Sequence, residues 1–290
     1  MVTANDVKIL REKTGAGMLD CKKALEQTNG DIEKAVDFLR EKGLAKAQSK
    51  QGRTAADGLA RIFIEKDLAL ILEINSETDF VAKNEHFLEL IEKVGTVLIK
   101  QPVSSVEEAL EVKEGAQTIA EMLLALTAKI GEKITLRRLT YLKAGANQTF
   151  GTYLHQGGKI AALTLVENAT FEIAKDVAMQ AAAMKPLYLN PESVPAEVLE
   201  REKTVLTQQA LNEGTKPEFV ERKIQGRIRK YFEEVCLTEQ AFFKNPSEKV
   251  SQYLAYTQSK LIDYICFRVG EGIEKKCQSF ADEVAEQLKK

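Results

Sequence analysis

The sequence has few of the side chains with which proteins bind metals or catalyse reactions. Its 290 residues include only two histidines, four cysteines and no tryptophan. The cysteines are scattered, and no two have C-x-x-C spacing; they are Cys21, Cys236, Cys266 and Cys277. We expect ordinary thiols of a reducing compartment. A zinc site would have to combine unpatterned residues from distant parts of the chain, so we expect no metal and no cofactor.

Long apolar runs and an excess of one charge are also missing. No stretch approaches the roughly 18 apolar residues that span a bilayer. The first residues have neither the basic start nor the apolar core of a secretory signal, so we expect a cytoplasmic chain. Because 41 Lys and Arg face 43 Asp and Glu, the net charge is −2 and gives no overall attraction to nucleic acid or membrane.

Motifs of enzymes are absent as well. Gly15-Ala16-Gly17 resembles part of a nucleotide-binding loop, but no strand precedes it and no Gly-Lys-Ser/Thr follows it. Gly270-x-Gly272 fails for the same reasons. No Ser, Cys or Thr lies in a nucleophile motif, and two histidines provide little acid–base capacity. The residues therefore indicate a multi-module binding protein rather than an enzyme.

Residues 1–54 are predicted to form a three-helix docking module followed by a tether. Asn5-Asp6 is the expected cap of the first helix, and an apolar stripe of helical spacing over 32–39 indicates the third. Gly43 stands where a glycine commonly ends a helix. The segment Ala45 to Asp57 is small, polar and basic, so we expect a tether that packs on nothing.

The central chain twice shows the order strand, turn, apolar strand and helix. The first succession covers residues 58–65, 68–74 and 81–100, and the second covers 151–154, 160–166 and 171–184. We therefore predict an α+β fold whose core duplicates a hairpin-plus-helix unit, in residues 55–145 and 146–266.

Two narrow apolar stripes with charged flanks follow, over residues 196–235. They predict an antiparallel coiled-coil hairpin that projects from the core. Two ordinary surface helices packed on the core are the alternative that the pattern leaves open. Residues 267–290 are predicted to form a C-terminal helical module with a helix over Phe280 to Leu288.

The segment Glu77 to Asn84 places an acid and a large aromatic between a strand and a helix, where functional loops often lie. Asp79 is a reasonable N-cap for the helix. Phe80 allows two interpretations. It lies one heptad before Phe87 and would then begin the core stripe, or it is an exposed wedge directed at a partner.

Two runs go beyond these generic patterns. Leu10 to Leu25, with the sequence LREKTGAGMLDCKKAL, closely resembles the N-terminal signature of bacterial translation elongation factor Ts. Thr78 to Asn84, TDFVAKN, resembles the second signature of that family. Shorter matches follow in the family's order, at residues 129–132, 184–186, 226–227 and 269–275.

The resemblance implies a guanine-nucleotide exchange factor for elongation factor Tu, in its GDP-bound and nucleotide-free states. The N-terminal module, similar to ubiquitin-associated domains, would dock on the GTPase domain. The core, its hairpin and the C-terminal module would supply further contacts. The family's segment that disturbs the bound magnesium corresponds to Thr78, Asp79, Phe80 and Val81. Further partner contacts by family position are Arg11, Met18, Ile130 and Gly131. Some relatives pair through the core, and the sequence leaves homodimerisation open.

Two positions depart from the family's pattern. Leu19 replaces a second methionine, a change that conserves volume. Gln180 stands where many members have a histidine that touches the GTPase, so no role is carried over to it. A ribosome- or RNA-associated structural binding protein is the alternative function, and the near-neutral charge argues against it.

Overall fold

The computed structural model describes residues 2–274, which fall into two compact units. Among these residues, the first unit takes in 2–65, 72–141 and 268–274, and the second takes in 66–71 and 142–267. Helices pack on antiparallel hairpins, so the predicted α+β class is confirmed. Cys277 and the predicted helix Phe280 to Leu288 lie outside the described residues. No helix among residues 2–274 is long and apolar enough to cross a bilayer.

Three helices begin the chain: α1 (Ala4–Thr14), α2 (Met18–Gln27) and α3 (Ile32–Ser49). They enclose a small core centred on Leu10 and Leu25, which are both fully buried. The predicted cap at Asn5-Asp6 lies two to three residues too late in the chain. Thr3 caps α1 instead, because its hydroxyl accepts from the Asp6 amide at 3.2 Å while the Asp6 carboxylate accepts from the Thr3 amide at 2.9 Å.

Helix α3 does not end at Gly43, and the predicted tether is wrong. The helix continues to Ser49 and packs along α7 (Ile119–Ile130). A Cβ at Gly43 would lie 3.3 Å from the Ala128 Cβ, so the glycine allows the two helices to approach closely rather than ending one of them. Ala47 is buried one turn later. The apolar pattern of the sequence is weak in this part of α3 because alanines and a glycine, rather than large apolar residues, form the contact with α7.

The first sheet has the strand order β1-β2-β5. Strands β1 (Asp57–Glu65) and β2 (Leu68–Ser76) form the predicted hairpin, and β5 spans Thr135–Lys143. The predicted helix over 81–100 is two helices, α4 (Asp79–Ala82) and α5 (Glu85–Lys100). Asn84 separates them because its side chain accepts from the His86 amide at 2.9 Å and begins a new helix.

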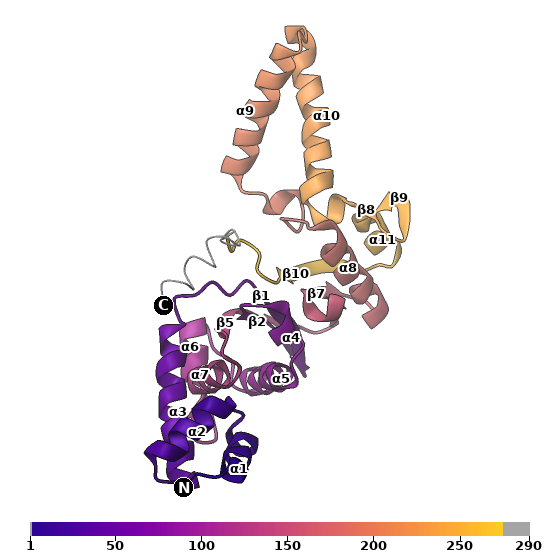
Figure 1. Ribbon diagram of the computed structural model, residues 1–290. Coiled ribbons are helices and arrows are strands. Elements are labelled where there is room, and N and C mark those ends of the chain that lie inside the picture. The colour runs from indigo at the N-terminus through magenta and orange to yellow at the C-terminus, as the bar shows by residue number, and fades with distance from the viewer. Residues whose placement is uncertain (1, 275–290) are drawn as a thin grey trace. The chain divides into compact units, whose positions relative to one another are not determined.

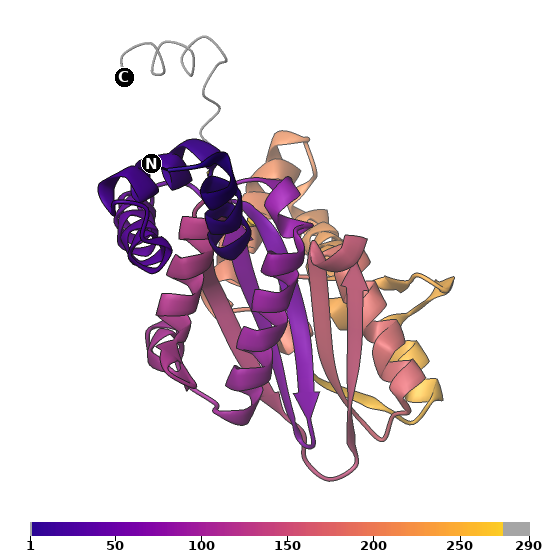
Figure 2. The same ribbon diagram turned by 60° about the horizontal axis from the view of Figure 1, so that its bottom comes forward.

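Helix α5 lies along the first hairpin, as its purple ribbon shows in Figure 2. The Phe63 ring of β1 fills the place where a Cβ of Gly95 would stand, and the Tyr141 hydroxyl of β5 donates to the Leu98 carbonyl at 2.8 Å. After α5 come α6 (Val106–Glu111) and the short hairpin β3 (Lys113–Glu114) and β4 (Gln117–Thr118), which lead into α7.

The second sheet has the order β10-β7-β6. The pair β6 (Gln148–His155) and β7 (Ile160–Glu167) is antiparallel, and α8 (Phe171–Met184) covers it. Strand β10 spans Lys260–Arg268. A Cβ at Gly151 would lie 2.1 Å from the Ala174 carbonyl oxygen, so glycine is required where α8 meets the sheet. Both predicted successions of hairpin and helix are therefore present.

Helices α9 (Ala196–Asn212) and α10 (Pro217–Val235) form an antiparallel hairpin (Figure 1). Leu206, Ala210 and Ile224 are buried along it. Near the turn, the Glu213 carboxylate accepts from Lys223 and Arg227 at 2.6 Å each, and these bonds lower the pKa of Glu213 to about 2. The chain then forms β8 (Ala241–Phe242), β9 (Asn245–Lys249) and α11 (Val250–Tyr256) before β10.

A buried charge cluster joins the first sheet to the segment after β10. Glu73 is fully buried and accepts from Arg137 at 3.0 Å, Arg138 at 2.6 Å and the Gly270 amide at 2.9 Å. Burial alone would raise the pKa of Glu73, but the Gly270 amide and the Arg138 guanidinium together lower it. A buried carboxylate with this many donors is stable as the anion.

This cluster predicts a pH-dependent loss of stability. Because the folded-state pKa of Glu73 is lowered, its contribution is complete above its ordinary pKa of 4.5 and is lost as the pH falls through the folded value. At neutral pH, Glu73→Gln should lower the free energy of unfolding by about 3 kcal/mol. The difference in the free energy of unfolding between wild type and Glu73→Gln, measured by urea unfolding, should become smaller below pH 4.5. A difference that stays constant down to pH 3 would contradict the assignment.

The glycine at position 270 predicts a second effect on stability. Gly270 has φ 76°, and a Cβ there would lie 2.1 Å from the Ala56 carbonyl oxygen. Gly270→Ala should therefore cost about 2–3 kcal/mol. The matched control is Gly226→Ala in α10, where a Cβ would meet nothing within 4 Å and alanine should instead gain about 0.5–1 kcal/mol. Urea unfolding of both variants measures these changes in the free energy of unfolding. Equal changes for the two variants would refute the prediction.

Candidate functional site

The short helix α4 carries the predicted site residues Thr78 to Val81. Thr78 is the N-cap, in extended conformation, and Asp79 is the first helical residue, so the prediction of Asp79 as the cap is wrong. The Asp79 carboxylate instead pairs with the Lys83 ammonium at 2.9 Å, one turn along the chain. Asp79 therefore lies on the surface of the turn, with its charge balanced by a neighbouring lysine.

Phe80 is not part of the core. Its side chain is 79% exposed, whereas the next two residues, Val81 and Ala82, are buried. The seven-residue spacing to Phe87 did not predict a shared buried face because the helix is interrupted at Asn84. Phe80 and Phe87 therefore lie on two separate helices, α4 and α5. The interpretation of Phe80 as the start of the core stripe is therefore wrong. The structure presents a large apolar ring to solvent on a turn whose following residues are anchored.

Thr78 is held at three atoms. Its amide and its hydroxyl donate to the two carboxylate oxygens of Glu132, at 2.9 and 2.8 Å. Its carbonyl accepts from the Ser76 hydroxyl at 2.8 Å. Glu132 follows Gly131, which ends α7 in the left-handed conformation with φ 87°. The last turn of α7 thus fixes where α4 begins.

The C-terminal end of α7 also contacts the chain on both sides of α4. Before α4, Glu77 accepts from the Lys133 amide at 2.7 Å and pairs with Arg53 at 3.2 Å. After α4, the Lys129 ammonium donates to the His86 Nε2 at 2.9 Å. Residues 129–133 therefore contact the chain before, within and after the exposed segment.

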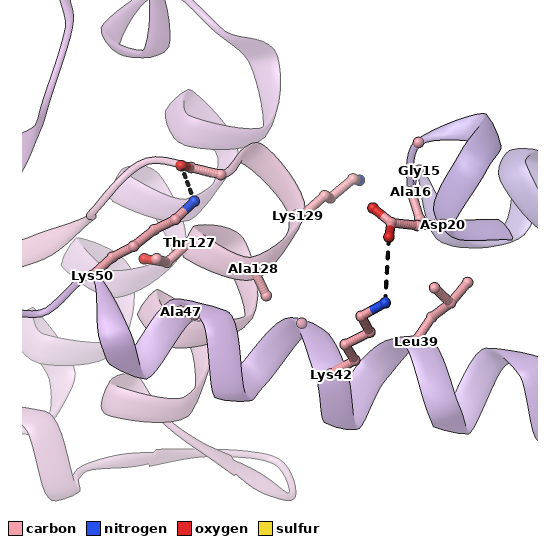
Figure 3. A pocket seen from close by; sticks show the side chains of 13 residues that line it. Gly15, Ala16, Asp20, Leu39, Lys42, Ala47, Lys50, Thr127, Ala128 and Lys129 are labelled. Atoms are coloured by element: carbon pink, nitrogen blue, oxygen red, sulfur yellow. Dashed lines mark hydrogen bonds and ion pairs between the residues drawn. The ribbon is translucent and has the colours of Figure 1, made fainter. Parts of the chain in front are cut away.

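A cavity of about 240 Å³ lies where α3 and the turn after α1 meet this end of α7 (Figure 3). Gly15, Ala16 and Gly17 line one side, and a Cβ at Gly15 would lie 3.3 Å from the Lys129 side chain. Lys50 of α3's C-terminal end donates to the Gly131 carbonyl. Lys42 pairs with Asp20 at 3.5 Å, as the dashed line in Figure 3 shows.

The structure thus brings together residues of three of the family-like runs quoted above: residues 15–17, 78–83 and 129–132. Arg11 and Met18 lie on α1 and α2 and are exposed, Met18 to 60%. Ile130 is half-buried, and Gly131 is the cap of α7. The sequence reasoning missed Glu132 and Glu77 as supports of α4, although Glu132 belongs to the quoted run. Glu132 and Thr78 are 54 residues apart in the chain, so their contact can be recognised only in the folded structure.

The sequence model of the family described as Elongation factor TS matches residues 77–271. The match begins one residue before Thr78 and contains α4, the end of α7 and the turn at Gly270, and it covers more than half of the chain. The chain belongs to the elongation factor Ts family. Members of this family are translation elongation factors, which act in protein biosynthesis.

Position 180, where many members of the family have a histidine, is an internal hydrogen-bonding position in this chain. Gln180 of α8 is fully buried. Its Oε1 accepts from the Phe243 amide at 2.9 Å, and its Nε2 donates to the Ala241 carbonyl at 3.0 Å. The amide therefore supports the β8–β9 turn.

Removing this amide should destabilise the second unit. Gln180→Leu leaves two backbone groups without their partners and should lower the free energy of unfolding by about 2–3 kcal/mol. Gln209→Leu, at an exposed position of α9, is the matched control and should change stability by less than about 0.5 kcal/mol. Urea unfolding measures both. A Gln180→Leu variant as stable as the control would contradict the structural role.

Proposed function

We propose that this chain is a guanine-nucleotide exchange factor for elongation factor Tu. It would accelerate GDP release by disturbing the magnesium and phosphate site and by stabilising the nucleotide-free GTPase, without covalent catalysis. The observation that carries the proposal is the 79% exposed ring of Phe80 on a turn held from both sides, within the residues that match the family. Thr78, Asp79, Phe80 and Val81 are the proposed contact segment.

Magnesium neutralises phosphate charge, so displacing it weakens nucleotide binding without any contact to the base. Asp79 brings a carboxylate, and Phe80 brings an apolar surface, to the same turn. Burying one phenylalanine is worth about 1.5–3 kcal/mol. A nanomolar ligand is bound by about 12 kcal/mol, so the segment alone cannot release it. Other contacts must supply binding energy that the returning nucleotide opposes.

The rest of the chain offers separate surfaces for these contacts. We place Arg11 and Met18 on the N-terminal docking module of residues 1–54, which resembles ubiquitin-associated domains. Ile130 and Gly131 would contact the partner beside α4. Further contacts with the partner would come from the duplicated core halves, 55–145 and 146–266, from the projecting hairpin and from the C-terminal module of 267–290. Pairing of two chains through the core, which the sequence leaves open, forms no part of the proposal.

Release of fluorescent GDP from elongation factor Tu, followed by stopped flow, tests the proposal. The wild-type chain should accelerate release, and Phe80→Ala should reduce the acceleration about 10- to 100-fold, as expected for the loss of one buried phenylalanine.

The control is Tyr256→Ala, which removes an 88% exposed aromatic ring at the end of α11, outside the residues named individually as contacts, and should change the rate much less than Phe80→Ala does. A wild-type chain that does not accelerate release would refute the exchange function. A Phe80→Ala variant as fast as wild type would refute only the role of the segment.

A further inference from the structure

We propose that Glu132 is a positioning residue, which sets the orientation of the Thr78–Val81 segment and so determines how Phe80 meets the partner. This inference rests on the proposed exchange function. The carboxylate lies at the end of α7 and bonds to no atom of Phe80 in the structure. Its effect on the partner would pass through Thr78.

The contact has the geometry of a clamp. Each oxygen of the Glu132 carboxylate accepts one hydrogen bond from Thr78, one from the amide and one from the hydroxyl. Hydrogen bonds to an ionised acceptor are stronger than neutral ones, and this pair is partly shielded from water because both residues are half-buried. Two bonds to one residue fix its orientation as well as its position.

The clamp explains why the cap of α4 is unusual. An N-cap threonine normally uses its side chain to accept from an amide of the first turn. Thr78 makes no such bond, because its hydroxyl faces Glu132. Helix α4 has only four residues and cannot hold its own conformation. Its direction therefore depends on the contact with α7 and on the burial of Val81.

Fixing the segment before binding favours exchange. An exposed ring on a loose turn would lose conformational freedom on meeting the partner, and this loss opposes association. With Thr78 clamped, the ring of Phe80 starts close to one orientation. Glu132 would then raise the rate of GDP release without touching the partner.

The test compares Glu132→Ala with Phe80→Ala and with the double variant, in the stopped-flow release of GDP over a range of exchange-factor concentrations. Glu132→Ala should lower the maximal release rate about tenfold, the loss expected from two charge-assisted hydrogen bonds of which part is recovered from water. In the Phe80→Ala background the same change should have no further effect, because Glu132 acts through Phe80. Effects that multiply, or a Glu132→Ala variant at the wild-type rate, would overturn the proposal.

Two conservative variants separate positioning from loss of folding. Glu132→Gln keeps the volume and one acceptor oxygen, so its rate should lie between wild type and Glu132→Ala. Thr78→Ser keeps the hydroxyl that Glu132 binds, so its rate should exceed that of Thr78→Val several-fold. Equal rates for Ser and Val at this position would count against the clamp. Glu111→Ala, at an exposed position at the end of α6, is the matched carboxylate control.

Hydrogen exchange measures the clamp without the partner. A peptide covering residues 77–84 should exchange about tenfold faster in Glu132→Ala than in wild type, while a peptide of α8 should not change. Unchanged exchange in residues 77–84 would overturn the clamp even where the release rate falls. A wild-type chain that fails to release GDP would overturn the exchange function, and its hydrogen exchange would still report whether Glu132 holds the segment.

Discussion

The left-handed turn at Gly131 is the constraint on which the first unit depends. A helix that ends in this conformation reverses its chain within a few residues. Glu132 and Lys133 therefore meet the segment before α4, while Ile134 returns to the core, where its amide donates to the Thr127 hydroxyl at 3.1 Å. The carbonyl of Gly131 accepts from Lys50 of the preceding module. One helix end thus organises three parts of the chain that are distant in sequence.

Under the proposed exchange function, a fixed helix end matters because a contact segment that yields on binding would disturb the partner less. If the segment around Phe80 could yield, the contact would cost binding energy and leave the magnesium site undisturbed. The buried side chains of Val81 and Ala82, together with the bonds to Thr78, leave the turn few ways to relax. The ring itself adds little entropy loss, since an aromatic side chain has only two rotatable bonds.

The strands and the long helices could be predicted from the sequence because apolar side chains repeat at the period of the element that buries them. Helix α8, predicted over Phe171 to Met184, has these same bounds. The prediction failed where burial uses small residues or a local polar contact. Gly43 packs on Ala128, and Asn84 breaks the helical phase through a bond to a backbone amide. The pattern likewise could not place Glu132, because a contact over 54 residues leaves no periodic signal.

The corrected length of α3 also changes how the N-terminal module would work. On a flexible tether, Arg11 and Met18 would bind the partner independently and only raise the local concentration of the core. In the structure, α3 packs on α7, and Gly15 lies beside Lys129, which in turn donates to His86 after α4. The module therefore contacts the same helix end that holds Thr78. Under the proposed exchange function, a contact at Met18 would therefore be made by a module packed on α7, not by a separate unit on a tether.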